Sequence, residues 1–276
     1  MEATITVENQ TIMIGDCLLR MAELADQSID LVVTSPPFNI GIKYGLYDDN
    51  QPRSQYLQSL RAIGNQIHRV LKPSGSLFLN VGSSNVDPWV LFDVAGVFRD
   101  LFVLQNHIIW IKSISIGDDT TGHFKPINSS RFLNHNHEAI FHFSKTGHVP
   151  IDRLAIGVPF KDKNNIRRRN HAADRRCAGN CWFVPYPTVN SKARKFDHPC
   201  GFPVELVKRC IRLHGVTNAV VLDPFLGAGT SLVAAWELGC VGFGVELDPV
   251  YAAAALTRLR ACSAQAAIFK FKESAT

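Results

Sequence analysis

The sequence predicts an α/β fold built on a mostly parallel, twisted β-sheet with helices on both faces. Short apolar runs recur at residues 29–34 (IDLVVT), 76–82 and 218–224, and continuous runs of this kind are typical of strands buried on both faces. Segments with helical spacing separate the runs, and strands that alternate with helices indicate parallel βαβ units. The length of 276 residues and the hydrophobic content of 46% allow one or two domains with a substantial core.

The individual elements follow from local patterns. Residues 4–14 predict a hairpin, and residues 54–71 predict a helix with one apolar stripe, which Lys72-Pro73-Ser74-Gly75 would end. The tail beyond Ala264 is expected to fray. Helices are also expected over 17–24, 88–101, 202–215, 229–239 and 249–262, and strands over 106–112, 137–145 and 240–247.

Two stretches, 113–135 and 145–198, lack either pattern. Structureless segments of this length are usually functional or form a small subdomain. The segment 145–198 holds 12 Lys and Arg but four Asp and Glu, so its net charge is +8. The whole chain carries +5, which leaves −3 for the remainder. A basic insert on a slightly acidic body favours a polyanionic partner such as nucleic acid, and a solvated basic loop is the alternative.

Bulk features bear on location. No run of about 18 apolar residues occurs, so no membrane span is expected. The N-terminus (MEATITVENQ) is acidic and polar, unlike a signal peptide. Seven cysteines without dense spacing indicate reduced thiols, so a cytoplasmic location is expected.

Residues 218–248 have the pattern of a nucleoside-binding βαβ unit. A strand ends at Asp223, a turn with Gly227 and Gly229 follows, and the next strand ends at Glu246, 23 residues after Asp223. Glycines let a ligand approach the backbone, and a carboxylate there suits the two hydroxyls of a ribose. The third glycine of the dinucleotide fingerprint is missing, which favours a nucleoside without a diphosphate. An ordinary βαβ unit with a glycine turn is the alternative.

A second unusual segment, TSPPF at 34–38, follows the predicted strand at 29–34. Its two prolines fix two φ angles and remove two N–H donors, and they push the preceding residues toward extended geometry. The result is a stiff loop whose carbonyls have no ladder partners. Such a loop is either a plain surface turn or a device that holds acceptors and an aromatic ring against a ligand.

Both segments resemble known motifs. DPFLGAGT (223–230) resembles the S-adenosyl-methionine loop of amino-methylating DNA methyltransferases, and TSPPF resembles their catalytic loop. The catalytic loop comes first and a basic region separates the two, which is the order of the beta group of these enzymes. GD at 15–16 and the segments 71–82, 137–145 and 198–206 agree, so the resemblance covers about residues 10–262.

The resemblance implies a Rossmann-like methyltransferase fold with circularly permuted motif order and an irregular target-recognition insert. Residues 1–144 would form the catalytic part, 145–198 the basic target-recognition region and 199–276 the cofactor-binding part of the same domain. Glu246 would hold the ribose hydroxyls and Asp16 would lie near adenine. Pro199 and Phe202 would close over the methionine end, although Phe202-Pro203 departs from the family's commoner lysine-containing version. The methionine and ribose portions would be lined by Asp223, Phe225, Gly227, Gly229 and Thr230.

The resemblance also implies a catalytic role for Ser35, Pro36, Pro37 and Phe38. The lone pair of an exocyclic amine is delocalised into the base, so the amine is a poor nucleophile. The Ser35 hydroxyl and the Pro36 carbonyl would accept hydrogen bonds from the amine as it becomes positive, with Phe38 stacked on the flipped base. Neither a metal nor a covalent intermediate is required. Phosphate contacts, with solvated surface charges as the alternative, are expected from Arg167, Arg168, Arg169, Arg175 and Arg176, and the segment with Arg131 would contribute to base reading.

The residue at position 35 bears on the target base. In the family an aspartate there usually accompanies adenine, and a serine accompanies the N4 amine of cytosine. Ser35 therefore predicts N4 methylation of cytosine in double-stranded DNA. Adenine N6 methylation and a catalytically silent DNA-binding module are the alternatives. A cognate restriction endonuclease and a homodimer stay open.

Three other interpretations are weaker. Pro199-Cys200 resembles the Pro-Cys pair of cytosine-C5 methyltransferases, but those enzymes place the pair after the cofactor loop. His171, Cys177, Cys181 and His198 have poor spacing for structural zinc. Amine methylators of proteins and small molecules generally have the cofactor loop before the catalytic loop, the reverse of the order here.

Overall fold

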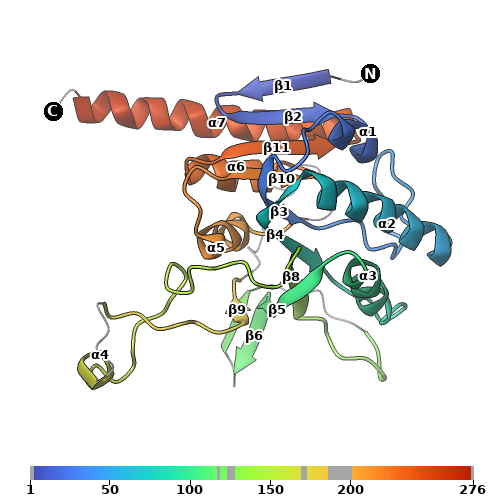
Figure 1. Ribbon diagram of the computed structural model, residues 1–276. Coiled ribbons are helices and arrows are strands. Elements are labelled where there is room, and N and C mark those ends of the chain that lie inside the picture. Colours follow the sequence, from blue (N-terminus) through green and yellow to red (C-terminus); the bar gives the residue numbers. More distant parts are fainter. Residues whose placement is uncertain (1–2, 117–118, 123–127, 169–172, 186–200, 275–276) are drawn as a thin grey trace.

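The computed structural model describes residues 3–116, 119–122, 128–168, 173–185 and 201–274 (Figure 1). Within them, nine strands form one sheet in the order β1-β2-β11-β10-β3-β4-β8-β5-β9, and β6 and β7 form a separate pair. The strands are β1 (Ala3–Val7), β2 (Gln10–Ile14), β3 (Ile29–Thr34), β4 (Leu71–Val81), β5 (Val103–Ile111), β6 (Ser113–Ile116), β7 (Asp119–Gly122), β8 (His137–Ser144), β9 (Cys181–Phe183), β10 (Val220–Asp223) and β11 (Val241–Glu246).

Helices flank the main sheet. They are α1 (Cys17–Ala22), α2 (Arg53–Val70), α3 (Val90–Arg99), α5 (Val204–His214), α6 (Thr230–Glu237) and α7 (Pro249–Ser274), whereas the short helix α4 (Asn164–Arg168) lies apart from the sheet (Figure 1). Neighbouring strands from β2 to β4 all run parallel, and β8 pairs antiparallel with both β4 and β5. The prediction of a mostly parallel α/β sheet is confirmed.

The apolar run of β3 explains why helices cover both faces. Val32 packs into a buried cluster with α1, α2 and α3, whereas Leu31 and Val33 pack into a second cluster with α5 and α6. Because alternate side chains of a strand point to opposite faces, a strand between two helical layers must be apolar throughout.

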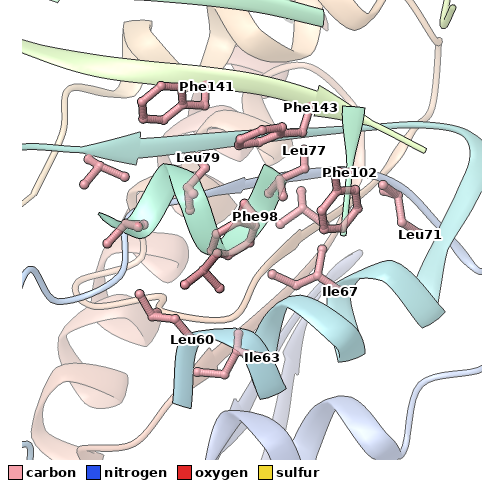
Figure 2. Close-up of a cluster of buried hydrophobic side chains, with 14 of the residues drawn as sticks. Leu60, Ile63, Ile67, Leu71, Leu77, Leu79, Phe98, Phe102, Phe141 and Phe143 are labelled. Atoms are coloured by element: carbon pink, nitrogen blue, oxygen red, sulfur yellow. The ribbon is translucent and has the colours of Figure 1, made fainter. Parts of the chain in front are cut away.

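The first helical layer is held by the stripe on α2. Leu60, Ile63 and Ile67 of α2 meet Leu77 and Leu79 of β4, together with aromatic rings from α3 and β8 (Figure 2). Each fully buried aliphatic side chain contributes roughly 1.5–3 kcal/mol. This packing holds α2 and the chain that precedes it, the loop that leaves β3, against the sheet.

The strand order reverses between β10 and β3. From β10 the chain passes through α6 to β11 on one side, and from β3 it passes through α2 to β4 on the other side. The two connections therefore diverge at the carboxyl ends of adjacent parallel strands. In open α/β sheets ligands bind in the crevice at such a point. Residue 35 and residue 224, each directly after one of these strands, meet there.

Three predictions about the irregular segments and the C-terminus are wrong. The stretch 113–135 contains the β6–β7 pair, and the basic segment contributes β9 to the main sheet beside β5. Trp182 of β9 is buried with Trp110, and this burial explains the added strand. The tail does not fray after Ala264, since α7 continues to Ser274. That stretch has no Gly or Pro and is rich in Ala and Lys, so the helix propagates.

Candidate active site

A cavity of about 530 Å³ lies at the carboxyl edge of the sheet, at the crevice between β10 and β3. Its wall comes from the loop after β3, the turn after β10, the end of β11 and the start of α1, with further residues from β4, β5 and β8. The segments that contribute come from both halves of the chain. The sequence-predicted residues in its lining are Asp16, Ser35, Pro36, Pro37, Phe38, Phe202, Phe225, Gly227, Thr230 and Glu246.

Glu246 is fixed by the backbone. Its Oε2 accepts a hydrogen bond from the Gly227 N–H at 2.7 Å, and its Oε1 accepts one from the Asp248 N–H at 2.8 Å. Each carboxylate oxygen keeps a further lone pair for a hydroxyl donor in the cavity. Burial raises the pKa of the Glu246 carboxyl, and the two backbone donors oppose that rise.

Asp223 lies beneath the cavity and is not part of its lining. The carboxylate is 1% exposed and accepts hydrogen bonds from Thr34 Oγ1 at 2.7 Å, Ser231 Oγ at 2.6 Å and the Phe225 N–H at 3.0 Å. It thereby ties the end of β3 to the turn after β10 and to α6. Burial raises the pKa of the Asp223 carboxyl, against these three donors.

Gly229 also lies outside the lining, and its geometry explains the residue type. Its φ of +82° is in the left-handed region, and a Cβ there would lie 2.7 Å from the Cβ of Ala255. No other residue fits both conditions. Gly229 lets α6 begin directly behind the cavity wall and pack against α7.

The two-proline loop is held rigidly. Tyr56 Oη donates to the Pro37 carbonyl at 2.8 Å, and the buried Asp49 carboxylate accepts from the N–H groups of Asn39 at 2.8 Å and Ile42 at 2.9 Å. No donor among the described residues hydrogen-bonds to the Pro36 carbonyl. The loop therefore leaves at the cavity a fixed carbonyl acceptor beside the Ser35 hydroxyl.

Sequence reasoning missed a polar network next to Ser35. Asn80 Nδ2 donates to Ser35 Oγ at 3.3 Å and to Glu138 Oε2 at 2.7 Å, and Glu138 Oε1 pairs with Lys112 Nζ at 2.6 Å. Asn80, Glu138 and Lys112 all line the cavity. A signal existed, because these residues lie at the ends of predicted strands that share the edge on which Ser35 lies.

Gly82 completes this corner of the cavity. A Cβ at Gly82 would lie 2.8 Å from the Phe38 ring and 3.2 Å from the Glu138 side chain. A side chain there would displace the ring that flanks Ser35. The end of β4 thus controls the position of Phe38.

The predicted DNA-contacting arginines lie outside the cavity. The five that the structure describes, all exposed, are Arg131, Arg167, Arg168, Arg175 and Arg176. The Arg131 guanidinium lies 4.9 Å from the Phe132 ring centroid, and Arg175 donates to the Leu154 carbonyl at 3.0 Å. In Figure 1, α4, which carries Arg167 and Arg168, lies far from the sheet.

Some predicted residues are not among those that the structure describes. Arg169, His171, His198, Pro199 and Cys200 lie outside the described residues. Cys177 and Cys181 are exposed, and the described residues contain no cluster of three or more side chains able to bind a metal. Among the helices that the structure describes, none has the length and apolar character needed to span a bilayer.

Two curated relatives illustrate the similarity to known proteins. The type II methyltransferase M.BglII of Bacillus subtilis is 28% identical over 257 residues, which cover 86% of this chain and 65% of that protein, just under two thirds of its length. The DNA adenine methyltransferase YhdJ of Escherichia coli (strain K12) is 28% identical over 265 residues, which cover 93% of this chain and 84% of YhdJ.

Solved structures share the fold. The PvuII DNA methyltransferase (cytosine-N4-specific) superposes with a TM-score of 0.71 at 22% identity, covering 92% of this chain and 87% of that chain. A putative DNA modification methylase of Thermus thermophilus, solved with S-adenosyl-L-methionine, has a TM-score of 0.60 at 27% identity and covers 90% of this chain and 94% of that chain. The predicted Rossmann-like methyltransferase fold is thus confirmed.

A family model also matches most of the chain. The family model N6_N4_Mtase, described as DNA methylase, matches residues 29–257, which include both the two-proline loop and the glycine turn. The chain therefore belongs to the N6/N4 DNA methylase family.

Proposed function

We propose that this protein transfers a methyl group from S-adenosyl-methionine to the N4 amine of a cytosine flipped out of double-stranded DNA. One observation supports the proposal above all. The acceptors at Ser35 and Pro36 and the carboxylate of Glu246 border the same cavity, although 211 positions separate Ser35 from Glu246 in the chain. A donor of methyl groups and an amine that receives one need such a shared site.

The cavity residues fit S-adenosyl-methionine. Glu246 would bind the ribose hydroxyls, and Gly227 exposes backbone close to the ligand. Phe225 and Phe202 offer apolar surface, and Asp16, the N-cap of α1, lines the cavity next to the end of β11. S-adenosyl-methionine supplies, when bound, a methyl group on a sulfonium sulfur. The neighbour from Thermus thermophilus was solved with this molecule.

The two-proline loop would bind the amine. Ser35 Oγ and the Pro36 carbonyl accept the two N–H groups, which directs the nitrogen lone pair away from the loop. Positive charge then develops on nitrogen between two fixed oxygen dipoles, which need no reorganisation. Phe38 stacks on the base, while Tyr56 and Asp49 hold the loop. Alignment of the amine contributes a large further share of the acceleration.

The choice of cytosine depends on Ser35. The Ser35 hydroxyl is uncharged, whereas the aspartate that usually accompanies adenine carries a negative charge. Asn80 donates a hydrogen bond to this hydroxyl. Adenine N6 is the second candidate, favoured by the similarity to YhdJ, whose name states adenine. A catalytically silent DNA-binding module is a third, which the rigid loop and the fixed Glu246 argue against.

The basic segment would hold the duplex. The exposed arginines on and near α4 would contact phosphates, which gives affinity with little sequence information. A target-recognition role for 145–198, a cytoplasmic location, a cognate restriction endonuclease and a homodimer stay predictions. The relatives named type II methyltransferases make a restriction partner worth testing.

Mass spectrometry tests the proposal directly. Genomic DNA from a host that expresses the protein is hydrolysed and its nucleosides are compared with DNA from a host without it. N4-methylcytosine is expected. N6-methyladenine would overturn the base assignment, and the absence of both would overturn the activity. Single-molecule sequencing of the same DNA gives the recognition site.

A further inference from the structure

Three strand ends continue the edge of the sheet beyond the catalytic loop. Next to Ser35 come, in the strand order, Asn80 of β4, Glu138 of β8 and Lys112 directly after β5. The register Trp110↔Glu138 between β5 and β8 places Lys112 beside the start of β8. Because β8 is antiparallel to both neighbours, its first residues share an edge with their last residues.

Polar contacts connect these residues into one network. The network runs from Lys112 Nζ through the Glu138 carboxylate and Asn80 Nδ2 to Ser35 Oγ, over contacts of 2.6, 2.7 and 3.3 Å. Both oxygens of Glu138 are used, so the amide of Asn80 must present nitrogen to it. The opposite amide orientation would set oxygen against a carboxylate. The position of Lys112 is therefore coupled to that of the catalytic hydroxyl.

The ion pair is in an unfavourable place for stability alone. The Lys112 side chain is 20% exposed and the Glu138 side chain is 15% exposed, so both charges are largely desolvated at the cavity wall. Replacing such a pair with apolar residues is often neutral or stabilising. Lys112 carries three N–H donors and Glu138 accepts from it, which leaves donor capacity toward the cavity. Asn80 Oδ1 is also buried without a partner among the described residues.

We propose that Lys112 recognises the O2 oxygen of the target cytosine and so helps to select cytosine over adenine, an inference that depends on the proposed function. In the proposed arrangement, the amine lies at Ser35 and Pro36, and the pairing edge of the base lies along the sheet edge toward Lys112, which lines the same cavity. Cytosine presents N3 and then O2 along this edge. Adenine presents N1 and then C2–H, which cannot accept a hydrogen bond. Glu138 holds the ammonium in place.

A cycle of base and protein changes tests this role. Duplexes carry, at the mapped site, either cytosine or a 2-aminopyridine C-nucleoside, which keeps the amine and ring nitrogen but has C–H in place of O2. Wild-type protein is expected to lose roughly 10- to 100-fold in kcat/KM on the analogue. On the cytosine duplex, Lys112→Met should have a kcat/KM lower than wild type by a similar factor. On the analogue duplex, its kcat/KM should equal that of wild type, because the contact to O2 is already absent there.

Two variants serve as controls. Lys208→Met removes another lysine whose side chain is 20% exposed and which pairs with Glu237 at 2.7 Å, but on α5 and outside the cavity lining. It should keep the full preference for cytosine over the analogue. Lys112→Arg keeps a cation with donors and should recover part of the preference. The affinity of each variant for S-adenosyl-methionine, measured by calorimetry, reports whether the cofactor side of the site is intact.

The outcomes separate this inference from the proposed function. If wild-type protein yields N6-methyladenine, the cytosine assignment fails and the role of Lys112 fails with it. If it yields N4-methylcytosine and Lys112→Met still discriminates against the analogue, only the inference about Lys112 fails. An equal loss on both duplexes, or a loss due to weaker duplex binding, would assign Lys112 to a phosphate contact or to structural support and would also overturn the inference.

Discussion

At the residue scale, fixed acceptors explain how the site could activate a weak nucleophile. Ser35 Oγ already accepts a hydrogen bond from Asn80, so one lone pair and the orientation of the hydroxyl are set before any base arrives. The Pro36 carbonyl is fixed by two proline rings and by the bond from Tyr56 to the adjacent carbonyl. The proposed chemistry depends on the positions of these two acceptors. Asn80 and Tyr56, which lie outside the two-proline motif, hold the acceptors in place.

Ser35→Ala should lower kcat by roughly 100-fold or more, since removal of one preorganised polar group commonly has that effect. The affinity for S-adenosyl-methionine should remain within a few-fold of wild type, because Ser35 belongs to the loop proposed to bind the amine rather than the cofactor. Single-turnover methyl transfer and calorimetry measure the two quantities. Ser59→Ala, a change at another cavity-lining serine, is the control. Transfer by Ser35→Ala at the wild-type rate would contradict the mechanism.

Glu246→Gln should weaken binding of S-adenosyl-methionine by roughly 10- to 100-fold, because hydrogen bonds to a charged acceptor are replaced and an amide cannot accept from both backbone donors. Burial raises the pKa of Glu246. As the pH is lowered, the affinity of wild type for S-adenosyl-methionine should therefore begin to fall at a pH above the ordinary pKa of a glutamate. Calorimetry across pH measures this. Glu237→Gln, on the surface side of α6, should bind like wild type. A pH-independent affinity in wild type would refute the role.

At the element scale, short-range patterns determined which segments become helices and strands, but long-range contacts determined their ends. The strand at 181–183 exists because Trp182 finds a buried place beside Trp110, a contact across more than 70 positions that no local pattern contains. The extension of α7 shows the opposite case. Its last turns follow from composition, because residues with high helix propensity continue the helix even where the apolar periodicity weakens past Ala264.

Gly229→Ala tests whether the start of α6 must be glycine. The substitution places Cβ 2.7 Å from Ala255 Cβ and forces alanine into φ +82°, so a loss of about 2–4 kcal/mol in the free energy of unfolding is expected. Gly239→Ala is the matched control, since Gly239 has φ +69° but no atom within 4 Å of the position that a Cβ would take. It should lose only about 1 kcal/mol. Urea unfolding measures both, and equal losses would show that packing against α7 is unimportant.

At the scale of the whole molecule, the site is the place where the sheet reverses its strand order. The two motifs and the fold class could be predicted, because proline pairs and glycine turns impose local geometry whatever surrounds them. The network of Asn80, Glu138 and Lys112 was missed, because its only sequence signal was the position of these residues at strand ends, and the strand order is needed to bring them together. Asp223 was predicted as a cavity residue, and the pairing of β10 with β3 instead buries it as a link between strands.

A buried histidine cluster joins the sheet to the helical layer opposite α2 and should make the stability of the whole fold depend on pH. Ser76 Oγ lies 3.0 Å from His142 Nε2 and 3.1 Å from His214 Nδ1, and the His142 ring stacks on Phe78 at 4.3 Å. Burial lowers the pKa of His142 to about 4 and also lowers that of His214, and His214 adds to the shift at His142.

Both histidines are therefore neutral in the folded protein at pH values at which the same residues of the unfolded chain are already protonated. Between about pH 6.5 and about pH 4 the unfolded state holds more protons, so the free energy of unfolding should fall as the pH is lowered, by about 3 kcal/mol for His142. The raised pKa values of Asp223 and Glu246 act in the opposite direction over their own range. A comparison with His142→Gln isolates the histidine contribution.

The measurement is urea unfolding at several pH values from 7.5 to 4.5, with wild type and His142→Gln side by side. Above pH 7 the two curves should differ by a constant, which reports the packing and hydrogen bonds lost with the ring. Below pH 6.5 the difference should shrink, because only wild type must exclude a proton from the His142 ring, whereas His214 is present in both proteins. A difference that stays constant to pH 4.5 would mean that His142 is protonated in the folded protein as it is in the unfolded chain. That result would contradict a neutral buried histidine cluster between the sheet and α5.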